Sequence, residues 1–496
     1  MSAFTPLDLI VLMTYMLGVT AWGAWLGRGQ TGGTDYFLGS RNLPWWAVML
    51  SVIATETSTL TFLSIPGVAY VGSLLFMQLT LGYLVGRVAV AAVLLPAYYR
   101  GDLTTAYALL ERRFGTGTRR FTSGVFMVTR LLADSVRLFA TAIPLALITG
   151  WEYPTSIAVI ALATVVYTYF GGIKAVVWVD VLQMGLYLGG ALLAMWVLHN
   201  GVPGGWAAIF ESAGDAGKLQ WLDLGFDLSV AYTFWAGLIG GAFLSMASHG
   251  TDQLIVQRLL TCRDLRSSQW ALVGSGFGVI VQFALFLVLG LGLWAFYGGA
   301  AFERSDEIFP LFIIEQLPPG VTGLLIAGVF AAAMSSLSSS MNSLASASAY
   351  DFWAPAVGAT GDEGRILRAG RMFTLLWAVL LVVGAVLFIP LSRTTAAVEV
   401  ALAVSSLVYG GLLGAFFLGV LSRRADARSV SVGVVVGIGS VTLIWLFARA
   451  EVAWPWFAVI GSAITFLVGE ALGRGRGPEQ DGPRGAAAAE ATRRAA

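Results

Sequence analysis

Polar residues crowd the middle of an apolar stretch that is long enough to cross a lipid bilayer. The stretch runs from Trp45 to Val71, and its segment "SVIATETSTLTF" at 51–62 contains one carboxylate, Glu56. Polar groups are costly in hydrocarbon, so where they occur they usually face a binding cavity or a pathway. We therefore expect a binding site beside Glu56 and its hydroxyl-bearing neighbours, which are Thr55, Thr57, Ser58, Thr59 and Thr61.

A second cluster of hydroxyls lies much later in the chain, in "AAAMSSLSSSMNSLASAS" at 331–348. Single serines in membrane helices commonly allow close packing or bond to their own backbone. This explanation is weaker here, because Ser335, Ser336, Ser338 and Ser339 cannot all serve one packing seam. Neutral oxygens suit a hard monovalent cation, which needs oxygen ligands without excess negative charge. The cluster therefore predicts part of a cation site.

The remaining cation ligands require free backbone carbonyls, which only an interrupted helix provides. In an unbroken helix each carbonyl is bonded to the amide four residues further on. Residues 54–58 are rich in β-branched and hydroxyl side chains that compete with helical hydrogen bonding. A break there would release carbonyls for a cation and amides for a solute. Because broken helices around a midplane site are typical of transporters, these residues indicate a cation-coupled transporter.

Ionisable residues inside the apolar runs supply the other candidates. Arg130 and Asp134 are four residues apart and share one face of a helix, so we expect a structural ion pair. Arg137 falls near the same stripe and either joins that pair or faces a cavity. The further members of this set include Arg87, Asp180 and Asp252.

The composition is that of a membrane protein. The 496 residues are 57% hydrophobic and 11% charged, whereas soluble proteins have about 25% charged residues. Apolar stretches recur, each of roughly 20 residues, which is the length of a transmembrane helix. The single cysteine excludes an internal disulfide and a multi-cysteine metal site. The sequence predicts an all-α polytopic membrane protein with no soluble domain large enough to be an enzyme.

Thirteen candidate spans cover most of the chain. They lie at 6–27, 44–71, 74–98, 120–149, 153–170, 175–198, 228–250, 270–297, 320–350, 367–391, 395–421, 427–447 and 452–472. Lysines and arginines gather after odd-numbered spans, for example at Arg41, Arg112 and Arg258, and in the tail. Cytoplasmic loops carry such an excess. We therefore expect a multi-pass protein of the cell membrane with its N-terminus outside and its C-terminus inside.

Four motifs together identify a resemblance that extends to about residue 470. They are "SRNLPWWAVMLSVIAT" at 40–55, "YFGGIKAVVWVDVLQ" at 169–183, "GTDQLIVQRLL" at 250–260 and "AAAMSSLSSSMNS" at 331–343. With these motifs the chain resembles the sodium:solute symporter family, which includes carriers of glucose, proline, iodide, monocarboxylates and sialic acid. The resemblance implies two inverted five-helix repeats with broken helices at the midplane. The domains would be a peripheral segment 1–43, a transport core 44–421, two peripheral helices at 422–473 and a disordered tail at 474–496.

The resemblance also implies that sodium is the cofactor, with two sodium ions bound per transport cycle. The first ion would be bound by the carbonyls of Ala54, Thr57 and Ala332 and by the hydroxyls of Ser335 and Ser336. The second would be bound by Asp180, Ser338 and Ser339. A capping or gating contact near the cytoplasmic end is the alternative role for Asp180.

The substrate site implied by the resemblance draws on residues from several spans. Ser58, Thr61 and Phe76 match positions used by sialic acid carriers, and Arg137 lies about one helical turn from the arginine that binds the carboxylate there. Sugar carriers have glutamine and glutamate where this chain has Thr61 and Thr80. The resemblance therefore assigns neither sialic acid nor a sugar to this chain as its substrate. The full predicted set is Glu56, Ser58, Thr59, Thr61, Phe76, Thr80, Arg137 and Asp252.

Glu56 departs most from the family, because several relatives have asparagine there and proline carriers have aspartate. Its carboxylate could add negative field to the sodium site, bind a cationic group of the substrate, or pair with Arg137. These three roles remain open from the sequence.

The predicted function is a sodium-coupled symporter that imports a small polar organic solute by alternating access. Its partners would be that solute and the lipid bilayer, with no nucleic acid and no obligatory protein partner. A membrane sensor without net transport and a proton-coupled carrier of the same fold are the alternatives. An intramembrane enzyme is remote, because the two histidines and one cysteine form no plausible catalytic set.

Overall fold

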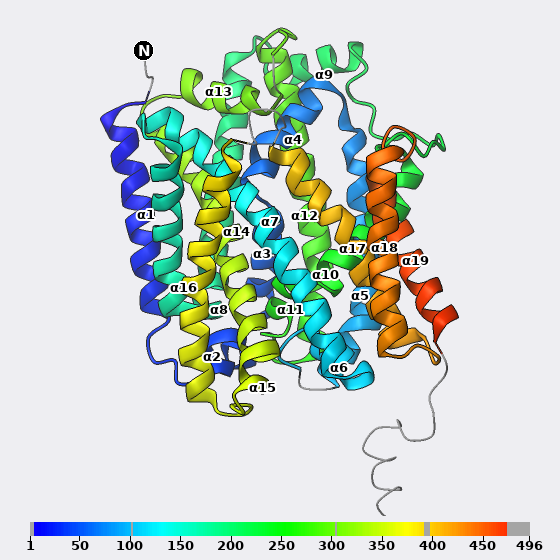
Figure 1. Cartoon of the computed structure of the whole chain (residues 1–496). Helices are drawn as coiled ribbons and strands as arrows, with labels where there is room; N and C mark the ends of the chain where they lie inside the picture. The colour runs from blue at the N-terminus through cyan, green and yellow to red at the C-terminus, as the bar shows by residue number, and fades with distance from the viewer. Residues whose placement is uncertain (1–3, 101–102, 303–304, 391–396, 474–496) are drawn as a thin grey trace, which may run out of the picture.

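The computed structural model describes residues 4–100, 103–302, 305–390 and 397–473 as a bundle of long helices (Figure 1). The predicted tail at 474–496 lies outside the described residues. The helices of at least 18 residues are α1 Pro6–Leu26, α5 Met77–Tyr99, α7 Thr116–Thr149, α8 Tyr153–Gly201, α12 Leu265–Phe296, α14 Val321–Ala347, α16 Glu363–Phe388, α17 Ala397–Leu421, α18 Ala427–Phe447 and α19 Pro455–Leu472.

Shorter helices connect these long ones or form parts of bent segments. They are α2 Gly33–Leu38, α3 Trp45–Glu56, α4 Thr59–Val71, α6 Ala108–Phe114, α9 Gly205–Asp215, α10 Gly241–Gly250, α11 Gln253–Leu259, α13 Ile308–Gln316 and α15 Ala354–Ala356. The 3₁₀ turns are η1 Gly39–Arg41, η2 Leu74–Phe76 and η4 Ser305–Glu307, and the π-helical turns are η3 Ala236–Gly240 and η5 Ser348–Trp353.

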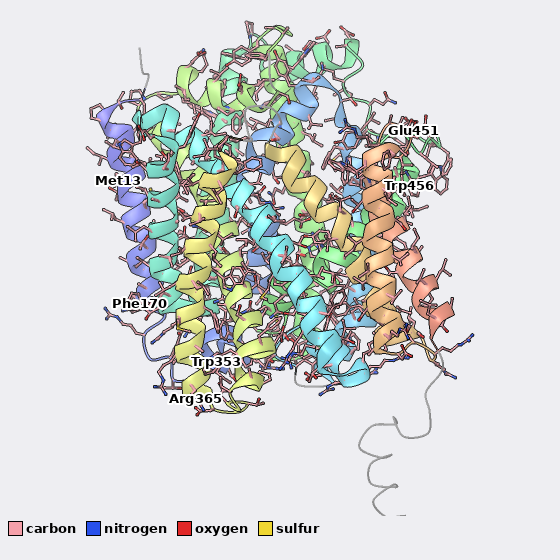
Figure 2. All side chains as sticks on the ribbon, viewed as in Figure 1. Met13, Phe170, Trp353, Arg365, Glu451 and Trp456 are labelled. Atoms are coloured by element: carbon pink, nitrogen blue, oxygen red, sulfur yellow. The ribbon has the colours of Figure 1, made fainter. Side chains whose placement is uncertain are left out.

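The composition of the helices confirms a polytopic membrane protein. Among the described residues, eight helices are long and apolar enough to cross a membrane, or nine if the bent pair α3 and α4 is one span. Lipid offers no hydrogen bonds, so the backbone must satisfy its own polar groups, as helices do. Apolar side chains such as Met13 and Phe170 accordingly lie on the outer surface (Figure 2). The number of thirteen spans stays a prediction.

The predicted spans 153–170 and 175–198 are the two helices of α8, a segment of 49 residues. It bends at Gly172, whose φ of 52° and ψ of −155° are non-helical. A Cβ atom at this position would lie 2.4 Å from the carbonyl oxygen of Tyr36. Glycine is therefore required here both for its backbone conformation and for the close approach of the neighbouring chain.

The predicted helix break occurs between α3 and α4. The first helix ends at Glu56, Thr57 has a non-helical ψ of 90°, and Ser58 is extended with ψ of 167°. The two helices are bent by 62° relative to each other. The expectation of a break within 54–58 is confirmed, although Ala54 and Thr55 still belong to α3.

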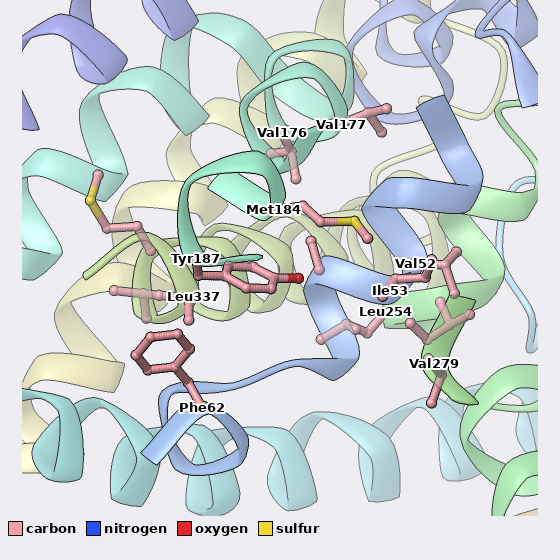
Figure 3. Close-up of a cluster of buried hydrophobic side chains, with 14 of the residues drawn as sticks. Val52, Ile53, Phe62, Val176, Val177, Met184, Tyr187, Leu254, Val279 and Leu337 are labelled. Carbon is pink, nitrogen blue, oxygen red and sulfur yellow. The ribbon is translucent and has the colours of Figure 1, made fainter. Parts of the chain in front are cut away.

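The serine-rich helix α14 occupies the centre of the bundle, where all residues from Leu325 to Ala347 are buried. It packs against α1, α3, α4, α7, α8 and α16. Small side chains allow such close approach between membrane helices. Near the break, Figure 3 shows Phe62 of α4 beside Tyr187 of α8 and Leu337 of α14, with the unwound segment running past them. The fold thus brings the two hydroxyl clusters of the sequence to one place.

Candidate functional site

The break between α3 and α4 redirects two backbone amides away from their helical acceptors. The amide of Ser58 donates to the carbonyl of Glu56 at 3.0 Å rather than to Ala54, its partner in a continuous helix. The amide of Thr61 donates to the hydroxyl of Ser58 at 3.4 Å rather than to the carbonyl of Thr57. The carbonyls of Ala54 and Thr57 therefore lose their ordinary helical partners, as a cation site at this break requires.

The serine helix α14 contacts this break directly. The hydroxyl of Thr59 donates to the carbonyl of Val329 at 3.3 Å, and the hydroxyls of Thr55 and Ser339 are 3.4 Å apart. The buried hydroxyl of Ser336 has no hydrogen-bond partner among the described residues. Because Ser336 also lines the small cavity described next, its hydroxyl is open to a ligand there.

A small cavity lies where α4, α7 and α14 meet. Its free volume is about 20 Å³, which is room for about one or two water molecules. A solute of several heavy atoms therefore needs these helices to move apart. The residues that line the cavity are Ser58, Thr59, Asp134, Arg137, Leu138, Thr141, Ala333, Ser336 and Leu337.

Arg137 both joins an ion pair and faces this cavity, so the two possibilities left open by the sequence hold together. Its Nη1 lies 3.1 Å from Oδ1 of Asp134, and its side chain is 23% exposed. The same carboxylate also accepts a hydrogen bond from Ser340 at 2.5 Å and lies 3.5 Å from Arg130. Asp134 is thus shared among three donors. Arg137 contacts it through Nη1, and the rest of its guanidinium is available to the cavity.

Glu56 pairs with Arg87 of α5, and its carboxylate lies 3.6 Å from Nε2 of His249. The hypothesis that it pairs with Arg137 is therefore wrong. Arg87 is fully buried whereas the Glu56 side chain is 20% exposed. This pairing could not be predicted from the sequence, because Arg87 lies on another helix and has no fixed spacing to Glu56.

Asp252 forms a buried ion pair with Arg130, which also donates to the hydroxyl of Tyr409 at 2.7 Å. The other oxygen of Asp252 caps α11 by accepting the amide of Leu254 at 2.9 Å. Arg130 is accordingly bound more closely to Asp252 than to Asp134, the partner expected from helical spacing, which is 3.5 Å away. Asp252 is not among the residues that line the cavity.

Three other predicted substrate residues lie outside the cavity lining. The ring of Phe76 stacks on Phe283 with centroids 5.1 Å apart, and the hydroxyl of Thr80 donates to the carbonyl of Met77 at 2.7 Å. Thr61 contributes its amide to the cap of α4. The structure thus brings Ser58, Thr59 and Arg137 together but places Glu56, Phe76, Thr80 and Asp252 in other contacts. Their assignment to substrate stays a prediction.

The predicted second sodium site is a compact buried cluster around Asp180 of α8. One carboxylate oxygen accepts the hydroxyl of Ser335 at 2.7 Å, and the other accepts the hydroxyl of Ser51 at 2.5 Å. Ser339 lies in the same cluster, and its hydroxyl donates to the carbonyl of Ser335 at 2.5 Å. The hydroxyl of Ser338 also donates to that carbonyl, at 3.1 Å.

Sequence reasoning missed the most prominent member of this cluster, Arg258 of α11. Its placement in a loop is wrong, because the residue belongs to α11, is fully buried and lies 3.1 Å from Asp180. The reason is that α11 folds back into the bundle directly after α10 ends at Gly250. The available signal was the mostly apolar segment around Arg258, in which Leu254, Ile255 and Val256 precede it and Leu259 and Leu260 follow it.

Gln282 of α12 was also missed. Its amide donates to the hydroxyl of Thr57 at 2.5 Å, whereas its carbonyl oxygen is buried without a partner among the described residues. Gln282 thereby holds the side chain of Thr57 at the break.

Comparison with known proteins agrees with this arrangement. The family model of the sodium:solute symporter family matches residues 36–437. The chain belongs to this family. It is therefore a sodium-coupled solute symporter of the membrane and not an enzyme.

Individual relatives cover most of this symporter. The sodium/sialic acid symporter NanT of Aliivibrio fischeri is 30% identical over 488 residues, covering 94% of this chain and 93% of NanT. The human sodium/iodide cotransporter is 28% identical, covering 91% of this chain and 71% of its own length. A solved structure of a substrate-bound, outward-open, sodium-coupled sialic acid symporter superposes with a TM-score of 0.85 at 28% identity, covering 94% of this chain and 98% of that one.

Proposed function

We propose that this symporter imports a small organic anion together with sodium. The observation that carries the proposal is the position of Arg137, whose guanidinium lines the cavity beside the hydroxyls of Ser58 and Thr59. Arginine matches the geometry of carboxylates and binds them through two parallel hydrogen bonds. Sialic acid and iodide, the solutes named for the two relatives above, are both anionic at neutral pH.

The first sodium ion in this proposal bridges the break to α14. Its ligands would be the carbonyls of Ala54, Thr57 and Ala332 with the hydroxyls of Ser335 and Ser336. Two observations support the assignment: the break redirects the amides that would occupy Ala54 and Thr57, and Ser336 is buried without a partner in the described structure. Neutral oxygens of this kind fit a monovalent hard cation.

A second sodium ion would bind at Asp180 with Ser338 and Ser339. Asp180 is the only charged member of this predicted ligand set, and it lies within hydrogen-bonding distance of Ser335, which is assigned to the first site. The shared serine would couple the two ions. Two sodium ions with one monovalent anion would move one net positive charge inward per cycle.

Sodium would act by favouring one conformation over another. An ion that joins α3 and α4 to α14 stabilises the arrangement in which the cavity is formed, and the solute then permits the rearrangement that opens the opposite side. The proposal includes the predicted topology: thirteen spans, inverted repeats within the core at 44–421, and an N-terminus outside. The close superposition on a sialic acid symporter supports it.

Uptake into proteoliposomes tests the proposal. With an inward sodium gradient, vesicles should accumulate a radiolabelled organic acid such as sialic acid or a short monocarboxylate, and an inside-negative potential should increase the rate. Neutral sugars should compete poorly. Equal uptake under a proton gradient without sodium would favour the proton-coupled alternative, and sodium-dependent binding without accumulation would favour a sensor.

A further inference from the structure

Arg258 occupies the same oxygens that the second sodium ion would use. Its Nη2 lies 3.1 Å from Oδ2 of Asp180 and also donates to the hydroxyl of Ser339. Its Nε donates to the hydroxyl of Ser51 at 2.9 Å, and its Nη1 donates to the carbonyl of Leu254 at 2.7 Å. Every nitrogen of the guanidinium therefore has an acceptor.

Charge balance makes this contact incompatible with a sodium ion at Asp180. Arg258 and Asp180 are both fully buried and together carry no net charge. A sodium ion added beside them would leave one uncompensated positive charge in a region of low dielectric, which is strongly unfavourable. The oxygens of Asp180 and Ser339 that face the guanidinium are also engaged as acceptors and cannot ligate a metal in the same direction.

We propose that Arg258 is a tethered cation that competes with the second sodium ion for Asp180, so that one is bound only when the other has withdrawn. This inference rests on the second sodium site of the proposed function and adds a residue outside the predicted ligand set. When sodium binds, Asp180 would exchange its ion pair with Arg258 for a contact with the transported sodium ion.

The competition has a structural consequence, because Arg258 joins four helices. From α11 it contacts Ser51 of α3, Asp180 of α8 and Ser339 of α14. Figure 1 shows α11 next to α3 in the interior of the bundle. When sodium takes Asp180, α11 loses this charged attachment while sodium keeps α8 attached to α14. When sodium leaves, Arg258 returns and keeps the buried carboxylate from remaining unpaired.

Sodium binding to the purified symporter tests the competition without a transport measurement. The half-saturating sodium concentration is measured by ²²Na⁺ binding and by the sodium-dependent rise in melting temperature, with potassium as the control ion. Arg258→Gln should lower the half-saturating concentration of the second ion by about tenfold or more, since a like charge a few Å away shifts ionic equilibria by roughly one to three log units. Arg258→Lys keeps the charge and should stay near the wild-type value.

Two further variants separate competition from general damage. Ser51→Ala removes one acceptor of Arg258 and one donor to Asp180. It replaces no predicted sodium ligand, and it should strengthen sodium binding by a smaller factor. In an Asp180→Asn background, Arg258→Gln should have no effect on sodium binding, because the shared carboxylate is gone. Arg258→Gln protein should also melt lower than wild type in potassium and recover specifically in sodium.

The results distinguish this inference from the proposed function. Unchanged or weaker sodium binding in folded Arg258→Gln would overturn the competition; if that variant does not fold, unchanged or weaker binding in Ser51→Ala would overturn it. In either case sodium binding by the wild type would leave the proposed function standing. A wild-type protein whose melting temperature and ²²Na⁺ binding show no specific response to sodium would instead overturn the proposed function itself.

Discussion

The cavity at Arg137 and the cluster at Asp180 contain similar residues in different environments. Each combines an arginine, an aspartate and at least one serine of α14. At the cavity the arginine is 23% exposed and Ser336 has no partner among the described residues. At the cluster both Arg258 and Asp180 are fully buried, and every nitrogen of Arg258 has an acceptor.

This difference separates a position ready for a ligand from one that the protein fills itself. Unpaired polar atoms beside free volume can gain interactions when a ligand arrives, so binding there costs little rearrangement. Fully paired groups must first lose contacts. The cavity is therefore suited to the solute, whereas the cluster is suited to an exchange in which one cation replaces another.

The largest expected effect is on stability and follows from Asp180→Ala. This change leaves Arg258 buried without its carboxylate, which costs about 3–5 kcal/mol in such pairs. The melting temperature of the detergent-purified protein should fall strongly. The double variant Asp180→Ala with Arg258→Gln should recover much of the loss, because both charges are then absent. If Asp180→Ala had the same melting temperature as the wild type, the ion pair of Asp180 with Arg258 would not stabilise the fold.

Arg137→Gln should have the next largest effect, and on transport rather than stability. Hydrogen bonds to charged groups contribute about 1.5–3 kcal/mol, so the affinity for an anionic solute should fall roughly 10- to 100-fold. The melting temperature should change little, because Asp134 keeps Ser340 and Arg130 as partners. Competition uptake and thermal unfolding measure the two quantities. A strong loss of stability with unchanged uptake would place Arg137 in the same class as Arg258.

Ser336→Ala tests the unpaired hydroxyl of the cavity. Loss of one oxygen ligand should raise the half-saturating sodium concentration by about tenfold, equivalent to about 1.4 kcal/mol. Stability in the absence of sodium should be unchanged or slightly greater, since a buried hydroxyl without a partner is removed. Sodium titrations of melting temperature report both effects. Unaltered sodium affinity would remove Ser336 from the first site.

The smallest effect on sodium binding is expected from Ser340→Ala, one helical turn from Ser336 on α14. Its hydroxyl donates to Asp134 at 2.5 Å and belongs to neither predicted sodium site. Its loss should cost about 1.5 kcal/mol of stability, the lower end for a hydrogen bond to a charged group, and leave sodium affinity as in wild type. The same titrations measure it beside Ser336→Ala. If the two variants changed the half-saturating sodium concentration equally, the unpaired hydroxyl of Ser336 would have no specific role in sodium binding.

Local rules determined much of this protein from its sequence. The apolar runs predict membrane helices, because a chain in lipid must satisfy its backbone hydrogen bonds internally. The hydroxyl-rich residues at 54–58 predict the break, because their side chains compete with helical bonding over a few residues. The serines at 335–339 predict oxygen ligands for a cation, because neutral hydroxyls suit a hard monovalent ion. Each of these signals acts over a short distance along the chain.

Only the tertiary structure decided which charges meet. Glu56 pairs with Arg87 rather than Arg137, Asp252 with Arg130, and Asp180 with Arg258. These choices depend on how helices rotate and cross, which sequence spacing does not specify across separate elements. A buried charge must find a partner in whichever helix faces it. The composition therefore established that such charges need partners, and the packing of the helices selected them.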